Sequence, residues 1–95
     1  ITPFEFALHQ NYPNPFNPET TIQFDVAENS DVSVSVFNVM GQKVATLING
    51  NLDAGVYQLT WNGLSDNGTA LPSGMYFYEM KSPEFHSVKK LVLVK

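Results

Sequence analysis

Three prolines within seven residues restrict how the start of this chain can fold. Pro13, Pro15 and Pro18 each hold φ at about −65° and lack a backbone N–H, and each keeps the preceding residue out of the helical region. The stretch can therefore be neither a helix nor a central strand. Tyr12 and Phe16 project from it, and a stiff connector with two aromatic side chains is expected to dock on a core. We predict a fixed, packed corner at the start of a small β domain.

Alternating apolar and polar residues predict short strands along the rest of the chain. The clearest alternation is that of Val32, Val34 and Val36 with two serines that would face water. No stretch has sustained helical periodicity. The pattern predicts an all-β fold, an immunoglobulin-like antiparallel β-sandwich of about seven strands, with a small closed barrel as the alternative. The predicted strands cover residues 4–8, 21–26, 32–36, 43–48, 56–61, 75–80 and 88–94, and a turn is predicted at Asn49-Gly50-Asn51.

The length of 95 residues predicts one domain over residues 1–95, in which residues 1–18 are an extended opening segment with the proline corner. The chain starts abruptly at Ile1-Thr2-Pro3, so we expect it to be a piece of something longer. It shows no signal peptide and no apolar run long enough to span a membrane.

The charge balance and the missing residue types exclude several classes of protein. The formal net charge is −4 and arginine is absent, which argues against a nucleic-acid-binding protein. Cysteine is absent as well, so neither disulfides nor thiolate metal sites can form. Hydrophobic residues make up 43% of the chain, which is typical of a folded domain rather than a disordered one.

Several side chains have a predicted structural role. Tyr57, Leu59 and Trp61 alternate on one face, which favours a core position for Trp61 over an exposed platform for stacking sugars. Gly41 is predicted to supply the positive φ of a hairpin turn. Both faces of residues 75–80 are apolar, which predicts a central strand. The residues expected to be structural are Gly41, Trp61, Gly74 and Tyr76, and those expected to add apolar area to the core include Val44, Val88, Leu91 and Leu93.

The sequence gives little support for metal, cofactor or catalytic sites. His9 and His86 stand in no metal-ligand spacing, and the loop at Asp66 lacks the pattern of a calcium loop, although a single structural calcium held by Asp66 and loop carbonyls stays open. Asn67-Gly68-Thr69 matches an N-glycosylation sequon, which matters only in a eukaryotic secretory route. No GxSxG motif or paired carboxylates are visible. We therefore predict a protein that is not an enzyme and needs no cofactor.

Lys89, Lys90 and Lys95 form the one basic cluster in this acidic chain. If residues 88–94 form a strand, Lys89 and Lys95 share one face and Lys90 lies on the other. The lysines are either solvated edge residues that discourage aggregation or a patch that recognises an acidic or polar partner.

Seven motifs, in order along nearly the whole chain, carry a resemblance to a known family. They are Leu-His-Gln-Asn-Tyr-Pro-Asn-Pro-Phe-Asn-Pro at residues 8–18, Thr-Thr-Ile-Gln-Phe at 20–24, Val-Phe-Asn-Val-Met-Gly-Gln-Lys-Val at 36–44, Ala-Gly-Val-Tyr at 54–57, Trp-Asn-Gly at 61–63, Leu-Pro-Ser-Gly-Met-Tyr-Phe-Tyr at 71–78 and Lys-Lys-Leu-Val-Leu-Val-Lys at 89–95. Together they resemble the type A C-terminal sorting domain of the type IX secretion system. Asn62 and Gln42 depart from the aspartate and arginine that are common in that family.

The resemblance implies a seven-stranded immunoglobulin-like sandwich at the C-terminus of a secreted protein of Bacteroidetes or related phyla. It implies Sec export to the periplasm, recognition by the outer-membrane translocon, and often removal by a sortase-like peptidase that joins the cargo to surface lipopolysaccharide. The expected location is therefore secreted or at the cell surface. The residues expected to carry recognition are Asn14, Pro15, Phe16, Asn17, Pro18, Lys89, Lys90 and Lys95.

Two other functions stay open. The sequence is also similar to the immunoglobulin-like domain of flagellar hook-capping proteins, which shares the glycine turn and the Trp-x-Gly loop. A structural module of this kind could associate with itself through its edge strands. A carbohydrate-binding module attached to a hydrolase is the third candidate. The proline motif and the lysine tail favour the sorting domain.

Overall fold

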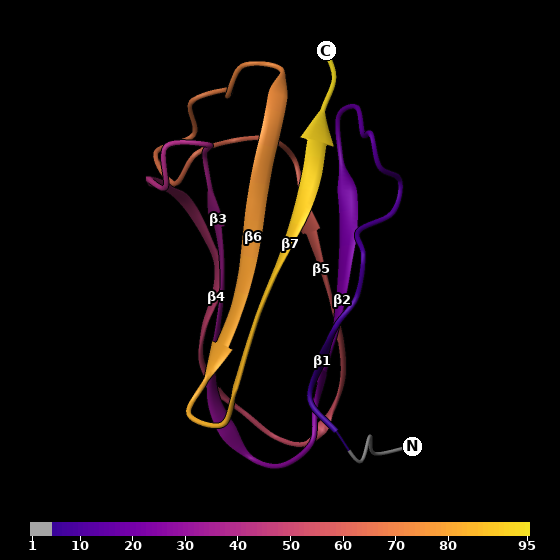
Figure 1. Cartoon of the computed structure of the whole chain (residues 1–95), viewed down its shortest axis with the longest axis vertical. Coiled ribbons are helices and arrows are strands. Elements are labelled where there is room, and N and C mark those ends of the chain that lie inside the picture. The colour runs from indigo at the N-terminus through magenta and orange to yellow at the C-terminus, as the bar shows by residue number, and fades with distance from the viewer. Residues whose placement is uncertain (1–4) are drawn as a thin grey trace.

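The computed structural model describes residues 5–95, which form two β-sheets packed face to face (Figure 1). One sheet has the strand order β1-β2-β5 and the other β4-β3-β6-β7, and every pair of neighbouring strands is antiparallel. The strands are β1 (Ala7–Leu8), β2 (Thr20–Val26), β3 (Ser30–Phe37), β4 (Lys43–Leu52), β5 (Gly55–Trp61), β6 (Gly74–Ser82) and β7 (Phe85–Leu93). The predicted all-β, immunoglobulin-like sandwich is confirmed. Within the described residues no helix could cross a membrane.

The period-two pattern explains how the strands face the core. In β2, Ile22, Phe24 and Val26 are all fully buried, and the residues between them are partly exposed. In β3 the three valines are buried in the same way. Ser35 differs from the prediction, because it is buried rather than facing water. The reason is that β3 lies between β4 and β6, whose side chains cover a small residue on the outer face.

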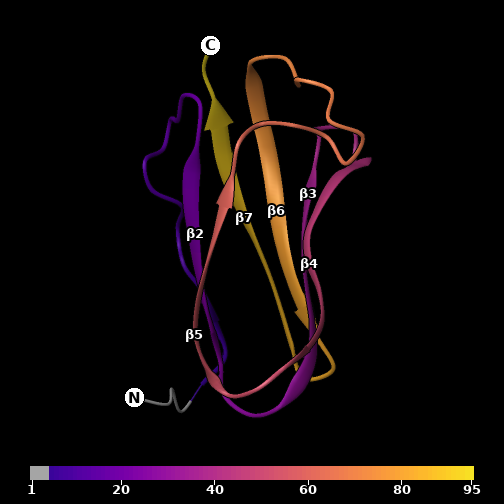
Figure 2. The same cartoon turned by 180° about the vertical axis from the view of Figure 1, so that it is seen from behind.

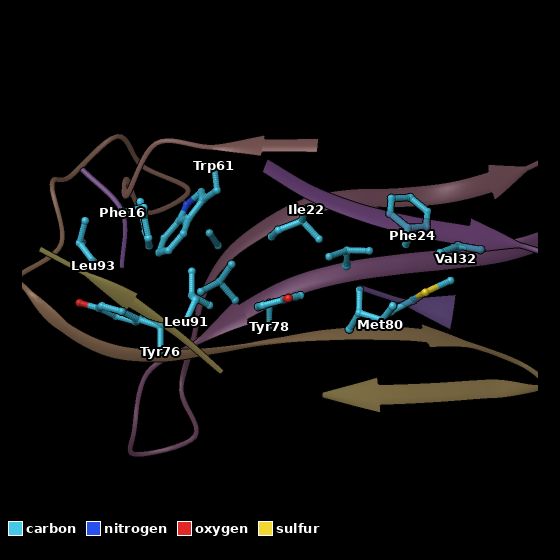
Figure 3. Packing of buried hydrophobic residues seen from close by; sticks show 14 of the residues in the cluster. Phe16, Ile22, Phe24, Val32, Trp61, Tyr76, Tyr78, Met80, Leu91 and Leu93 are labelled. Carbon is cyan, nitrogen blue, oxygen red and sulfur yellow. The ribbon is translucent and has the colours of Figure 1, made fainter. Parts of the chain in front are cut away.

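The predicted central position of residues 75–80 is confirmed, because β6 lies between β3 and β7. Tyr76, Tyr78 and Met80 point into the core and are buried. Met75 lies on the outer face and is exposed. Figure 3 shows the inward side chains of β6 beneath those of the opposite sheet.

The predicted turn at Asn49-Gly50-Asn51 is wrong. These residues belong to β4, which runs on to Leu52 and pairs Asn49 with Ser33 and Gly50 with Val32. The long partner strand β3 supplies ladder hydrogen bonds, and this pairing overrides the turn preference of the three residues. Val44, which was expected to point inward, is partly buried and packs against the core, and its neighbour Ala45 is fully buried.

The two end strands differ in detail from the predictions. Val88 does not add to the core, because it is 50% exposed. Its neighbours Leu91 and Leu93 share the inner face of β7, and Val88 falls on the outer face. The first strand is shorter than predicted: β1 contains only two residues. Phe4 lies outside the described residues, whereas Phe6 stacks on Phe85 with ring centroids 5.9 Å apart.

A glycine supplies the positive φ that was predicted for the turn after β3. Gly41 has φ +83° in the β3–β4 hairpin, and its N–H donates to the carbonyl of Asn38. The Asn38 side-chain oxygen accepts the N–H groups of Met40 and Gln42 at 3.0 Å each, which holds the turn together. Gly74 has φ +151° at the start of β6. Residues other than glycine rarely adopt either of these backbone conformations.

An aromatic cluster closes one end of the core. Trp61 is 2% exposed, in agreement with its alternation with Leu59 and Tyr57. Its ring lies 5.6 Å from that of Phe16 and 5.8 Å from that of Tyr76, in tilted and edge-on geometry respectively (Figure 3). Such aromatic pairs add stability beyond the area that they bury.

Replacing Trp61 with alanine should therefore lower the free energy of unfolding by about 3–5 kcal/mol, measured by urea denaturation. In the unchanged protein the Trp61 fluorescence should be blue-shifted and poorly quenched by acrylamide. Met40→Ala is the matched control, because Met40 is 79% exposed and its loss should change stability by less than about 0.5 kcal/mol. Free access of acrylamide to Trp61 would contradict this packing.

Candidate functional site

The proline segment, residues 9–18, lies along the upper end of β7, where Figures 1 and 2 both show it beside the C-terminus. The Phe16 N–H donates to the Val92 carbonyl at 3.0 Å, and the Val94 N–H donates to the Phe16 carbonyl at 3.0 Å. These two bonds form a parallel bridge between Phe16 and Leu93. The proline segment therefore pairs with the last strand along the edge that β6 leaves open.

Two side chains of the proline segment bind the same edge. The Asn14 side-chain oxygen accepts the Val92 N–H at 2.9 Å, and the Gln10 amide donates to the Lys90 carbonyl at 2.8 Å. Backbone groups of β7 that would face solvent thus have partners within the chain. We call this set of contacts between residues 9–18 and β7 the clasp.

A buried amide holds the proline segment in shape. Asn11 is 3% exposed, and its side-chain nitrogen donates to the Pro13 carbonyl at 3.2 Å and to the Thr20 hydroxyl at 2.9 Å. Thr20, also buried, donates in turn to the Pro13 carbonyl at 2.8 Å. Because proline lacks an N–H, side chains are needed to define the turn.

Phe16 anchors the segment to the core. Its side chain is 1% exposed and lies against Trp61 (Figure 3). The second aromatic residue does not dock: Tyr12 is 80% exposed, contrary to the expectation that both would pack. The Tyr12 backbone exchanges two hydrogen bonds with Thr21 in β2, and this pairing directs its side chain away from the core.

The hydroxyl of Tyr78 connects the segment to the centre of the four-stranded sheet. It accepts the Asn11 N–H at 2.8 Å and donates to the His9 carbonyl at 2.6 Å. Burial of the side chain raises the pKa of Tyr78 to about 12, although the hydrogen bond from Asn11 acts in the opposite direction. Burial also raises the pKa of Tyr76, whose hydroxyl donates to the Pro72 carbonyl.

The residues expected to carry recognition fall into two groups. Phe16 is buried and Lys89 is half-buried on the inner side of β7 opposite Tyr78, so neither is freely presented to a partner. The exposed members are Asn14, Pro15, Asn17, Pro18, Lys90 and Lys95. The structure thus brings the proline motif and the last strand together, but it divides the lysines between faces.

The remaining sites considered from the sequence have structural partners. The His9 ring lies 3.1 Å from the Asp25 carboxylate, and His86 contacts Glu79. The Asp66 carboxylate accepts the Thr46 N–H at 2.8 Å. Among residues 5–95, no group of three or more histidine, cysteine, aspartate or glutamate side chains is placed to hold a metal ion.

Two shallow hollows lie away from the clasp. An apolar hollow of about 280 Å³ on the outer face of the four-stranded sheet is lined by residues that include Phe37, Phe77 and Val88. A polar hollow of about 410 Å³ lies beside the loop after β5. Trp61 forms part of its wall, but at 2% exposure it presents no ring face on which a sugar could stack.

No sequence pattern predicted that Gln10 contacts β7, or that Asn11 and Tyr78 hold the proline segment in place beside the clasp. Their partners at Lys90, Thr20 and the backbone of residues 9–11 are up to 80 residues away in sequence. The one available signal was a polar Gln-Asn pair directly before the prolines, in a segment predicted to pack.

Replacing Tyr78 with phenylalanine should destabilise the fold by about 1–3 kcal/mol, because it leaves the Asn11 N–H and the His9 carbonyl without their partner. The raised pKa means that the folded state holds the tyrosine proton more tightly than the unfolded state does. That stability is present below pH 10.0 and is lost as the pH rises to about 12.

Urea denaturation at a series of alkaline pH values tests this point. The unchanged protein should lose more stability across this range than Tyr78→Phe does, and Tyr76 accounts for part of the loss that remains. Equal losses in the two proteins would show that Tyr78 does not titrate with folding.

Comparison with solved structures finds the same fold in parts of other bacterial proteins. Dimeric latent PorU of Porphyromonas gingivalis matches with a TM-score of 0.74 and 20% identity over 99% of this chain and 10% of PorU. PorZ, an essential surface component of the type IX secretion system of the same organism, matches with a TM-score of 0.63 and 17% identity over 94% of this chain and 12% of PorZ. These two likenesses show the fold, and this chain spans only a small part of either protein.

FlgD of P. aeruginosa matches with a TM-score of 0.60 and 25% identity, over 78% of this chain and 58% of FlgD. No curated protein matches the chain. The family model described as the FlgD Ig-like domain matches residues 13–84, which is well over half of the chain. The strand order and this match lead to one assignment: the chain belongs to the FlgD Ig-like domain family.

Proposed function

We propose that this protein is a non-catalytic C-terminal sorting domain, which directs a secreted protein through the periplasm and the type IX secretion system to the cell surface. The observation that carries the proposal is the clasp. The two motifs that most favour the sorting family, at residues 8–18 and 89–95, lie at opposite ends of the chain and are hydrogen-bonded to one another in the fold.

The clasp suggests what a translocon component would contact. The buried Phe16 side chain anchors the proline segment to the core beside the end of β7. The exposed residues of the segment therefore lie along that end of the strand; they are Asn14, Pro15, Asn17 and Pro18. Lys90 and Lys95 flank the bridged residues and are exposed. We infer a composite surface, in which the opening segment and the last strand are recognised together and only when the domain is folded.

The fold shared with PorZ supports this assignment, because PorZ is itself a type IX surface component. The partners proposed on this basis are the translocon and a sortase-like peptidase. The domain would supply contacts and no chemistry, and we propose no cofactor.

A hook-cap-like assembly module is the second candidate. The family match over residues 13–84 and the likeness to FlgD favour it. In that case the sandwich would serve as a building block that holds neighbouring subunits, and a fused reporter would gain no route to the cell surface.

A reporter fusion in a type IX-competent bacterium separates the two candidates. A reporter that carries this chain at its C-terminus should reach the cell surface, whereas a hook-cap-like module would leave it in the periplasm. In the double variant Lys90→Gln and Lys95→Gln, the reporter should remain in the periplasm. The free energy of unfolding of the domain should change by less than about 0.5 kcal/mol. The matched control is Lys81→Gln, an exposed lysine on β6 that should have no effect on sorting.

The outcomes are distinguishable. If the unchanged chain fails to sort a reporter that is folded and exported, the sorting proposal is wrong. If both the unchanged chain and the double variant sort normally, the lysines are solvated edge residues, and recognition depends on the backbone of the last strand or on the proline segment.

A further inference from the structure

β5 (Gly55–Trp61) is an edge strand that this chain leaves unprotected. Among residues 5–95 it pairs with β2 alone, over its full seven residues. Figure 2 shows β5 at the front, and the ribbon that passes behind it, β7, belongs to the other sheet. The outward N–H and C=O groups of such a strand are a ready template for another strand.

The other strand edges each have a form of protection. β1 is only two residues long, and the clasp covers the upper end of β7. On β4, the Asp66 carboxylate accepts the Thr46 N–H and the Asp66 N–H donates to the Val44 carbonyl at 3.1 Å. The β3–β4 pairing also contains two register shifts, and such irregularities discourage the addition of a further strand.

The composition of β5 also differs from that of the other long edge strands. Its sequence, Gly-Val-Tyr-Gln-Leu-Thr-Trp, contains no charged residue and no proline. By contrast, β7 contains Lys89 and Lys90, and β4 begins with Lys43. Charges and prolines are the usual means by which edge strands avoid pairing. Their absence from the longest fully open edge indicates that this edge has a partner.

Apolar surface also remains open along β5. Tyr57 and Leu59 pack against the core but are only half-buried, and Tyr57 stacks on Phe24 with ring centroids 5.4 Å apart. On the outer face Val56 is 53% exposed. A strand added beside β5 would cover these side chains on both faces of the sheet.

We propose that β5 pairs antiparallel with β5 of a second copy of this chain, which joins the two three-stranded sheets into one continuous sheet. A two-fold axis at Gln58 places Tyr57 opposite Leu59 of the second copy on the inner face. It places Val56 opposite Thr60 of the second copy on the outer face. At the ends, Trp61 meets Gly55 of the second copy, so the largest side chain lies opposite the smallest.

This self-complementarity is the reason to choose a second copy rather than a foreign strand. Around Gln58, inward apolar residues meet inward apolar residues and outward uncharged residues meet outward uncharged ones, along the whole strand. No like charges face each other, although each copy carries a net charge of −4. An isologous pair of this kind also closes after two copies, because both copies use the same edge. The inference does not depend on the sorting proposal.

Sedimentation of the purified 95-residue chain tests the pairing. The average mass should rise toward that of a dimer at concentrations on the order of 10 μM to 1 mM, as expected for a weak interface. Gln58→Lys brings two like charges together at the two-fold axis and should weaken dimerisation by about fivefold or more. The matched control is Gln23→Lys, which adds the same charge on the same outer face opposite Gln58, but on the internal strand β2.

A charge swap tests the register. Gln58→Glu alone should also weaken the dimer, and an equimolar mixture with Gln58→Lys should recover it, because the opposite charges then meet at the axis. A chain that stays monomeric throughout, or dimerisation that Gln23→Lys weakens as much as Gln58→Lys does, would overturn the proposal. So would a dimer that neither substitution at Gln58 affects, because the copies would then meet on another surface.

Discussion

The parallel bridge between Phe16 and β7 is the contact on which the rest of this sandwich depends. The Phe16 backbone forms hydrogen bonds with Val92 and Val94, and the Phe16 ring packs in the core against Trp61. One residue therefore joins the two ends of the chain, covers the edge of the last strand and completes the aromatic cluster. A proline-rich segment suits this role, because it has little conformational freedom to lose when it docks.

Alternation along the strands made the architecture predictable, because each buried face repeats every second residue. The errors arose where a tertiary neighbour decides the outcome. Asn49 and Gly50 favour a turn by themselves, but β3 extends alongside them and draws them into β4. Val88 is apolar like Leu91, yet it lies on the outer face of β7. Because two lysines separate them, the alternation did not show which of the two residues faces the core.

The candidate site could be predicted only in outline. The stiffness of the prolines indicated a packed corner, and Phe16 is its anchor. No local pattern could show that Asn14 binds the backbone of Val92, or that Tyr78 connects the corner to β6, because these contacts join residues 67 to 78 positions apart. Tyr12 and Phe16 look alike in the sequence, and only the pairing of Tyr12 with β2 explains why one is exposed and the other buried.

Amide hydrogen exchange measures the clasp most directly. The Phe16 and Val94 N–H groups each donate one hydrogen bond across it. If the clasp is part of the cooperative fold, both amides should exchange with opening free energies within about 1 kcal/mol of those of the β6–β7 ladder. Exchange of Phe16 and Val94 at the rate of an unprotected peptide, while the β6–β7 amides stay protected, would show that the proline segment is a loose leader and that the account is wrong.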